Sequence, residues 1–306
     1  MSDSGPVIDV RGLVKTFGST RALDGLDLQV ARGEVHGFLG PNGAGKTTTL
    51  RILLGSVRAD SGTATVLGLD PWKDVETLHA KLSYVPGDVA LWPNLSGGEV
   101  IDLLGRLQGG HDPARRARLL EMFELDPTKK ARTYSKGNRQ KVALVAALAA
   151  RAELFLFDEP TSGLDPLMEE HFRRCVHELK DDGRTVLLSS HILSEAEALS
   201  DRISIIRAGS VVESGRLSDM QHLQRLAISA ETEHELHGIT DIPGLGDVVV
   251  EGNHLRCSVE PAHLAELLSH LTAAGIKTLE SHPPTLEQLF LSHYAVAVEQ
   301  DATDHG

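Results

Sequence analysis

The most constraining feature of this sequence is the glycine-rich segment G-P-N-G-A-G-K-T at residues 40–47. It fits the pattern G-x-x-x-x-G-K-[ST] of a phosphate-binding loop, whose backbone amides point at phosphate oxygens where a helix begins. An apolar run at 35–39 precedes the segment, and the run T-T-L-R-I-L-L at 48–54 follows it. These flanks read as a buried strand entering the loop and a helix leaving it. The segment therefore predicts an α/β fold that binds a nucleotide.

Two residues of the loop carry most of its expected chemistry. Lys46 is expected to neutralise the β- and γ-phosphates, and the Thr47 hydroxyl is expected to hold Mg²⁺. A chance glycine-rich turn is the alternative, but it explains neither the strand before the segment nor the helix after it. The residues expected around the nucleotide are Gly40, Pro41, Asn42, Gly43, Ala44, Gly45, Lys46, Thr47 and Thr48.

A second apolar run ends in two carboxylates. Residues 154–157 read L-F-L-F, which is typical of a central strand covered on both faces, and Asp158 and Glu159 follow directly. Open α/β sheets bind their ligands at the carboxyl ends of strands. We therefore expect Asp158 to hold Mg²⁺ through water, and Glu159 to orient and deprotonate the water that attacks the γ-phosphate. His191 follows the apolar strand 185–190 and is expected at the same edge of the sheet.

The segments on either side of the loop predict further parts of the nucleotide-binding domain. Strands at 7–17 and 22–30 are expected to form an antiparallel flap beside the loop. Phe17 lies at its tip, and the spacing leaves two readings open: the ring stacks on an adenine, or it packs in the core. Residues of about 87–150 predict a helical subdomain, with helices near 97–107, 113–123 and 135–150.

Taken together, these motifs resemble the ATP-binding subunit of an ABC transporter over about residues 7–215. The resemblance implies a P-loop NTPase of ABC type, with a mixed-sheet core, an antiparallel β flap and a helical subdomain. The segment Y-S-K-G-N at 134–138 is similar to the signature element of the drug- and antibiotic-exporting, daunorubicin-resistance-type branch. The matching positions imply ATP-binding roles for Ser135, Gly137 and Asp165, a switch role for His191, and adenine stacking by Phe17. Residues 162–165 match the loop that bridges two subunits in this family.

The resemblance also implies partners and a place in the cell. In this family the signature of one subunit completes the nucleotide site of another, so a second ATP-binding subunit is expected, most economically as a homodimer. A separate membrane permease is expected to dock on the helical subdomain, which puts the chain at the cytoplasmic face of the cell membrane, exporting a drug or antibiotic-like compound. The alternative is a non-transport or regulatory ABC-type ATPase with weak hydrolysis.

Two local features complicate the match. The segment L-S-G-G-E at 95–99 looks more like the usual signature than 134–138 does, but it lies two helices too early. Ser96 and Glu99 have a simpler reading as a capping box. After the strand that ends at Pro86, the family usually has a glutamine that touches Mg²⁺ and relays the nucleotide state, whereas this chain has Gly87 and then Asp88.

Composition excludes some classes of function. The chain has 306 residues, a formal net charge of −13 and no run of basic residues, so a nucleic-acid partner is not expected. The longest apolar run, 142–150, is well short of the roughly 18 residues that a membrane span needs. The first six residues do not resemble a signal peptide.

The pattern changes near the end of the match and predicts a second domain. We expect an ATP-binding domain at 1–217, a small α+β domain at 218–298 and a disordered tail at 299–306. The expected elements of the second domain are strands near 225–230, 248–251, 254–260 and 276–280, and helices near 261–274 and 285–296.

Overall fold

The computed structural model describes residues 5–217, 219, 226–236, 238–239 and 242–282. The chain divides into two compact units, with the boundary between Gly215 and Arg216. Within the described ranges, no helix has both the length and the apolar character needed to cross a membrane.

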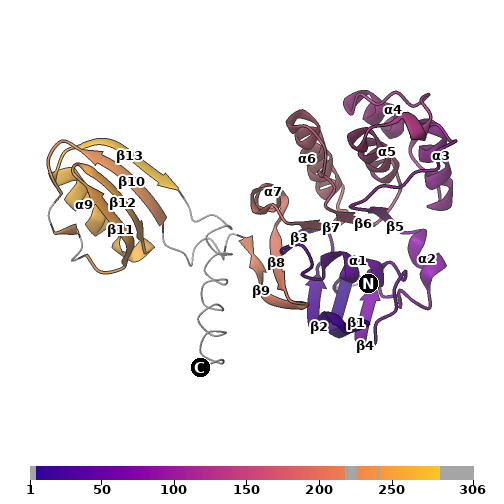
Figure 1. Ribbon diagram of the computed structural model, residues 1–306, viewed down its shortest axis with the longest axis horizontal. Coiled ribbons are helices and arrows are strands. Elements are labelled where there is room, and N and C mark those ends of the chain that lie inside the picture. The colour runs from indigo at the N-terminus through magenta and orange to yellow at the C-terminus, as the bar shows by residue number, and fades with distance from the viewer. Residues whose placement is uncertain (1–4, 218, 220–225, 237, 240–241, 283–306) are drawn as a thin grey trace. The chain divides into compact units, whose positions relative to one another are not determined.

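The first unit contains two β-sheets (Figure 1). A six-stranded sheet has the order β5-β6-β7-β3-β8-β9, and its strands are parallel from β5 through β8. A three-stranded antiparallel sheet has the order β2-β1-β4 and is the predicted flap, to which β4 adds a third strand. The strands are β1 Ile8–Phe17, β2 Thr20–Val30, β3 Val35–Leu39, β4 Ser61–Val66, β5 Leu82–Val85, β6 Leu154–Asp158, β7 Thr185–Ser190, β8 Arg202–Arg207 and β9 Ser210–Arg216.

Strand β6 is buried on both faces, as its apolar run predicts. Leu154 and Leu156 pack with the flap and with the helix that follows the phosphate loop. Phe155 and Phe157 pack on the opposite face, among residues of the two helices that flank β6 in the sequence. The helices of this unit are α1 Lys46–Leu53, α2 Val75–His79, α3 Gly97–Leu107, α4 Pro113–Met122, α5 Lys136–Leu148, α6 Pro166–Asp181 and α7 Leu193–Leu199.

The predicted helical subdomain is formed by α3, α4 and α5, which gather near β5 in Figure 1. Helix α3 begins with the capping box expected from the sequence: the Glu99 amide donates to Ser96 Oγ at 3.2 Å, and the Ser96 amide donates to Glu99 Oε2 at 2.6 Å. The segment at 95–99 therefore starts α3, and the segment at 134–138 leads into α5. Helix α7 has no counterpart among the elements expected from the sequence.

The second unit is a four-stranded antiparallel sheet in the order β11-β12-β10-β13. Its core includes Ile228, Leu255 and Val259 from the strands, and Leu267 and Leu271 from α9. The predicted helix at 261–274 is a short 3₁₀ turn, Pro261–His263, followed by α9. The elements are β10 Leu226–Thr232, β11 Leu245–Glu251, β12 His254–Val259, α9 Leu264–Ala273 and β13 Ile276–His282. The helix expected at 285–296 and the tail expected at 299–306 lie outside the described residues.

Candidate nucleotide site

The phosphate loop connects β3 to α1, as its sequence predicts. All five residues of β3 are buried, and Gly45 caps the amino end of α1 with a left-handed φ of 114°. A Cβ atom at Gly45 would lie 2.7 Å from Leu23 Cδ2 and 2.8 Å from the Ala22 carbonyl oxygen, both in the flap. Only glycine therefore fits where the loop passes this close to the flap.

Lys46 reaches back across the loop. Its ammonium group donates hydrogen bonds to the carbonyl oxygens of Gly40 at 2.6 Å and Pro41 at 3.1 Å, and Nζ lies 3.5 Å from Glu159 Oε1. Burial lowers the pKa of Lys46 below its ordinary value of 10.5, while the charge of Glu159 opposes that shift. A desolvated cation at the start of a helix is suited to receive phosphate oxygens.

Asp158 is the most enclosed carboxylate of the site, with 2% of its surface exposed. Its Oδ2 atom accepts a hydrogen bond from Thr47 Oγ1 at 2.9 Å, and its Oδ1 atom accepts one from Ser189 Oγ at 2.7 Å. A hydroxyl and a carboxylate oxygen are the hard donors that Mg²⁺ prefers, so this pair fits the predicted metal position. Burial, together with the charge of Asp158, raises the pKa of the Tyr84 phenol to about 12, so the neighbouring side chain stays neutral.

No group of three or more His, Cys, Asp or Glu side chains forms a metal cluster among the described residues.

Glu159 lies in the turn that leaves β6. Its backbone has a left-handed φ of 48°, and its amide faces the backbone oxygen and the Oγ atom of Ser189 at 3.1 and 3.2 Å. Its Oε1 atom lies 3.2 Å from His191 Nδ1 as well as 3.5 Å from Lys46 Nζ. Because β6 and β7 are adjacent and parallel, their ends bring these two predicted catalytic side chains together.

The signature segment contacts the predicted bridging loop at 162–165 within this chain. Ser135 caps α5 and accepts a hydrogen bond from the Asn138 amide at 3.3 Å. A Cβ atom at Gly137 would lie 2.7 Å from the Gly163 carbonyl oxygen, and Lys136 Nζ donates to Ser162 Oγ at 3.3 Å.

Asp165 caps α6 by accepting a hydrogen bond from the Met168 amide at 3.0 Å, and Pro166 occupies the first turn of this helix. The helix cap accounts for Asp165 by itself, so the contact of Asp165 with nucleotide stays a prediction. The contacts of Ser135 and Gly137 with nucleotide also stay predictions.

Phe17 does not pack in the core. It ends β1 with 49% of its surface exposed, and the Lys15 ammonium lies 5.3 Å from the centre of its ring. This excludes the core reading and leaves the stacking role as a prediction.

Gly87 lies against the backbone of Asp158, since a Cβ atom there would be 3.2 Å from the Asp158 carbonyl oxygen. The chain after β5 therefore passes beside Asp158 with no side chain at this position.

Sequence reasoning missed Ser189, which holds both Asp158 and Glu159 through its hydroxyl group. The signal was present, because Ser189 lies near the carboxyl end of β7, two residues before His191.

A strand–loop–helix phosphate site, with a carboxylate pair at the end of another strand of the same parallel sheet, defines the P-loop NTPase class.

Comparisons with known proteins narrow this class. A family model described as ABC transporter matches residues 23–162. A daunorubicin resistance ATP-binding protein of Streptomyces coeruleorubidus is 37% identical over 307 residues, covering 95% of this chain and 96% of the relative. A linearmycin resistance ATP-binding protein of Bacillus subtilis is 33% identical, with coverages of 94% and 97%. The chain therefore belongs to the ABC transporter family, and the resemblance inferred from its motifs is confirmed.

Solved structures agree with this assignment. The structure of an ATP-binding subunit of an ABC transporter matches with a TM-score of 0.65 and 31% identity, covering 70% of this chain and 92% of that one. A dimeric ATP-binding cassette in a post-hydrolysis state bound to ADP and Pi matches with a TM-score of 0.63 and 25% identity, covering 69% and 98%. The predicted fold of an ABC-type P-loop NTPase is confirmed, and ATP hydrolysis is the activity of this class.

Proposed function

We propose that this chain is the ATP-hydrolysing subunit of a transporter that exports a drug or antibiotic-like compound through a separate membrane permease. The observation that carries the catalytic part is the position of the Glu159 carboxylate, which lies 3.5 Å from Lys46 Nζ and 3.2 Å from His191 Nδ1. The three side chains come from separate segments and converge at the carboxyl ends of the parallel strands.

In the proposed hydrolysis, Glu159 accepts a proton from the attacking water as the water oxygen bonds to the γ-phosphorus and the bond to the ADP oxygen breaks. Lys46 holds the β- and γ-phosphates, and His191 orients Glu159 and the terminal phosphate. Bound Mg²⁺, held by Thr47 with Asp158, would neutralise phosphate charge. The geometry supports this assignment over the alternative of a weakly hydrolysing regulator, because the base and its partner histidine are already in contact.

The relatives' drug-resistance names support export as the purpose of hydrolysis. A second copy of the chain would complete each site, since the amino end of α5 at Ser135 would face the γ-phosphate bound by the partner. Asp165, in the loop that bridges the two subunits, would add a contact to the nucleotide, and Phe17 would stack on the adenine. The dimeric cassette among the matching structures supports this arrangement.

The proposed docking surface for the permease is an apolar cavity of about 380 Å³ beside the helical subdomain. It is lined by Tyr84, Val89, Trp92 and Leu107 among others, and Trp92 and Leu107 expose 50% and 67% of their surfaces. Exposed apolar side chains around a cavity fit an apolar helix end of a partner. Docking there would hold the chain peripherally at the cytoplasmic face of the cell membrane.

The test is ATP turnover and ATP binding by the purified chain, compared with Glu159→Gln. Loss of a general base typically costs about 10²–10⁴-fold, so the variant should bind ATP and lose at least a hundredfold in turnover. Glu99→Gln is the matched control, because glutamine also completes a capping box, and its turnover should equal that of the wild type. Undiminished turnover by Glu159→Gln would remove Glu159 from the role of base.

The dimer is tested with the same variant. With hydrolysis stalled, saturating ATP should convert Glu159→Gln from monomer to dimer in light scattering, and ADP should not. A chain that stays monomeric with ATP would contradict the homodimer.

A further inference from the structure

One carboxylate of α7 joins the two segments that carry the hydrolytic side chains. Glu195 Oε1 accepts a hydrogen bond from Thr161 Oγ1 at 2.9 Å, and Glu195 Oε2 accepts one from Ser190 Oγ at 3.0 Å. Thr161 follows Glu159 by two residues, and Ser190 directly precedes His191. Glu195 therefore connects the turn after β6 to the end of β7.

The two hydroxyl groups are held inside the protein. Thr161 and Ser190 expose 8% and 2% of their surfaces, and each bonds a different oxygen of the Glu195 carboxylate. Ser190 Oγ also accepts a hydrogen bond from the Ile192 amide at 2.9 Å, which ties it to the start of α7. Because the two oxygens of one carboxylate each accept a hydrogen bond from a buried hydroxyl group, this connection is well suited to fix the distance between the two segments.

The turn that carries Glu159 needs such support. A non-glycine residue at a φ of 48° that also precedes a proline has an unfavourable backbone conformation, which persists only where neighbouring contacts hold it. One side of the turn is held by α5, where Gln140 Nε2 donates to the Pro160 carbonyl oxygen at 2.8 Å. Glu195 holds the turn from α7 through Thr161.

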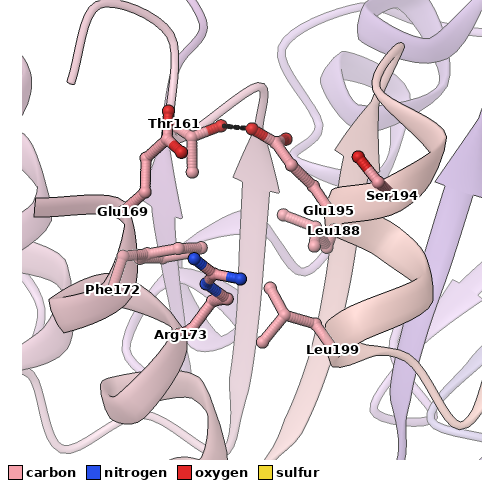
Figure 2. Close-up of a pocket in the computed structure, with 8 residues that line it drawn as sticks. All are labelled: Thr161, Glu169, Phe172, Arg173, Leu188, Ser194, Glu195 and Leu199. Atoms are coloured by element: carbon pink, nitrogen blue, oxygen red, sulfur yellow. Dashed lines mark hydrogen bonds between the residues drawn. The ribbon is translucent and has the colours of Figure 1, made fainter. Parts of the chain in front are cut away.

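A cavity of about 150 Å³ lies next to this contact (Figure 2). In Figure 2, Thr161, Glu169 and Glu195 lie at one end, and the rest of the lining combines the polar side chains of Arg173 and Ser194 with the apolar side chains of Phe172, Leu188 and Leu199. Among the residues that line this cavity, Glu195 is the one whose side chain accepts the Thr161 hydrogen bond. Removal of the Glu195 carboxylate would therefore leave the turn free to shift toward this space.

We propose that Glu195 is a positioning residue for ATP hydrolysis, which clamps Thr161 to Ser190 and so sets the contact between Glu159 and His191. This inference rests on the proposed function, in which Glu159 is the general base. It assigns Glu195 no contact with ATP, water or metal. A base displaced by about 1 Å can cost on the order of a hundredfold in rate, so loss of the clamp should slow the chemical step and spare binding.

The test uses the full chain and measures kcat, KM, ATP affinity and thermal unfolding for Glu195→Ala. We expect kcat to fall about ten- to hundredfold, with KM and ATP affinity within about twofold of the wild type. Glu195→Gln should retain more activity than Glu195→Ala, because its amide oxygen still accepts one hydrogen bond and its amide nitrogen can donate to the other hydroxyl. Glu169→Gln, which alters a carboxylate lining the same cavity, should leave kcat unchanged.

A second comparison separates positioning from general loss of structure. In the Glu159→Gln background, adding Glu195→Ala should lower the residual turnover no further, because the group being positioned is already lost. An unchanged kcat in Glu195→Ala, or an equal fall in both backgrounds, would overturn the inference.

If Glu195→Ala does not fold, Thr161→Val removes one hydroxyl of the clamp with little change in shape. It should lower kcat with KM preserved, and an unchanged kcat would again overturn the inference. Full turnover by Glu159→Gln would instead refute the proposed function, so the two failures are distinguishable.

Discussion

Replacing Ser189 by alanine measures how strongly the fold holds the Asp158 carboxylate, the proposed metal ligand. The Ser189 hydroxyl is fully buried, donates to Asp158 Oδ1 at 2.7 Å and lies 3.2 Å from the Glu159 amide. A hydrogen bond to a charged group contributes about 1.5–3 kcal/mol, and the alanine side chain leaves little empty space. We therefore expect the free energy of unfolding of the first unit to fall by about 2 kcal/mol.

Ser83→Ala is the matched control, because Ser83 is equally buried in the same sheet and donates to a neutral acceptor, the Ala147 carbonyl oxygen, at 3.3 Å. A neutral hydrogen bond contributes about 1 kcal/mol, so this variant should lose about half as much stability. Urea unfolding followed by tryptophan fluorescence suits the comparison, since both tryptophans, Trp72 and Trp92, lie in the first unit.

The same pair of variants separates stability from metal binding. Loss of a side chain that orients a metal ligand typically costs about 10–100-fold in metal affinity. The Mg²⁺ concentration for half-maximal ATPase activity should therefore rise at least tenfold in Ser189→Ala and stay unchanged in Ser83→Ala. Equal losses of stability, or an unaltered Mg²⁺ requirement, would refute the reasoning.

Two further outcomes follow from the site. Gly137→Ala places a Cβ atom 2.7 Å from the Gly163 carbonyl oxygen, so we expect it to cost about 1–3 kcal/mol in urea unfolding and to weaken ATP-dependent dimerisation. Lys136→Ala, which removes the hydrogen bond to Ser162, should change neither the free energy of unfolding nor ATP-dependent dimerisation. Equal losses in the two variants would contradict the steric argument. Burial lowers the pKa of Lys46 below 10.5, so the ammonium loses its proton at a lower pH than an exposed lysine does. Since phosphate binds the charged form of Lys46, ATP affinity should fall as pH rises toward 10.5, by at most tenfold per pH unit. ATP binding measured from pH 7 to 10 should show this fall in the wild type, and the affinity of Lys46→Ala should not change with pH in the same way.

Much of the site could be predicted because its chemistry lies in contiguous residues. The loop at 40–47 follows from glycine geometry and from charge at a helix terminus, and the pair Asp158 and Glu159 follows from an apolar run that ends in carboxylates. Helix α7 was not predictable in the same way. It has seven residues, of which only Ala196 and Leu199 are buried, so it presents too few apolar positions to show helical periodicity.

The sequence by itself therefore predicted which side chains are suited to bind phosphate and which carboxylates are available, because these depend on local backbone geometry and residue type. Only the tertiary structure decided how the carboxylates are held. Ser189 and Glu195 act across strands that are adjacent in the sheet and distant in the chain, and no local pattern encodes a hydrogen bond from Thr161 to a residue 34 positions later. The exposure of Phe17 was also a tertiary outcome, since the packing of the flap selects which of its apolar residues are buried.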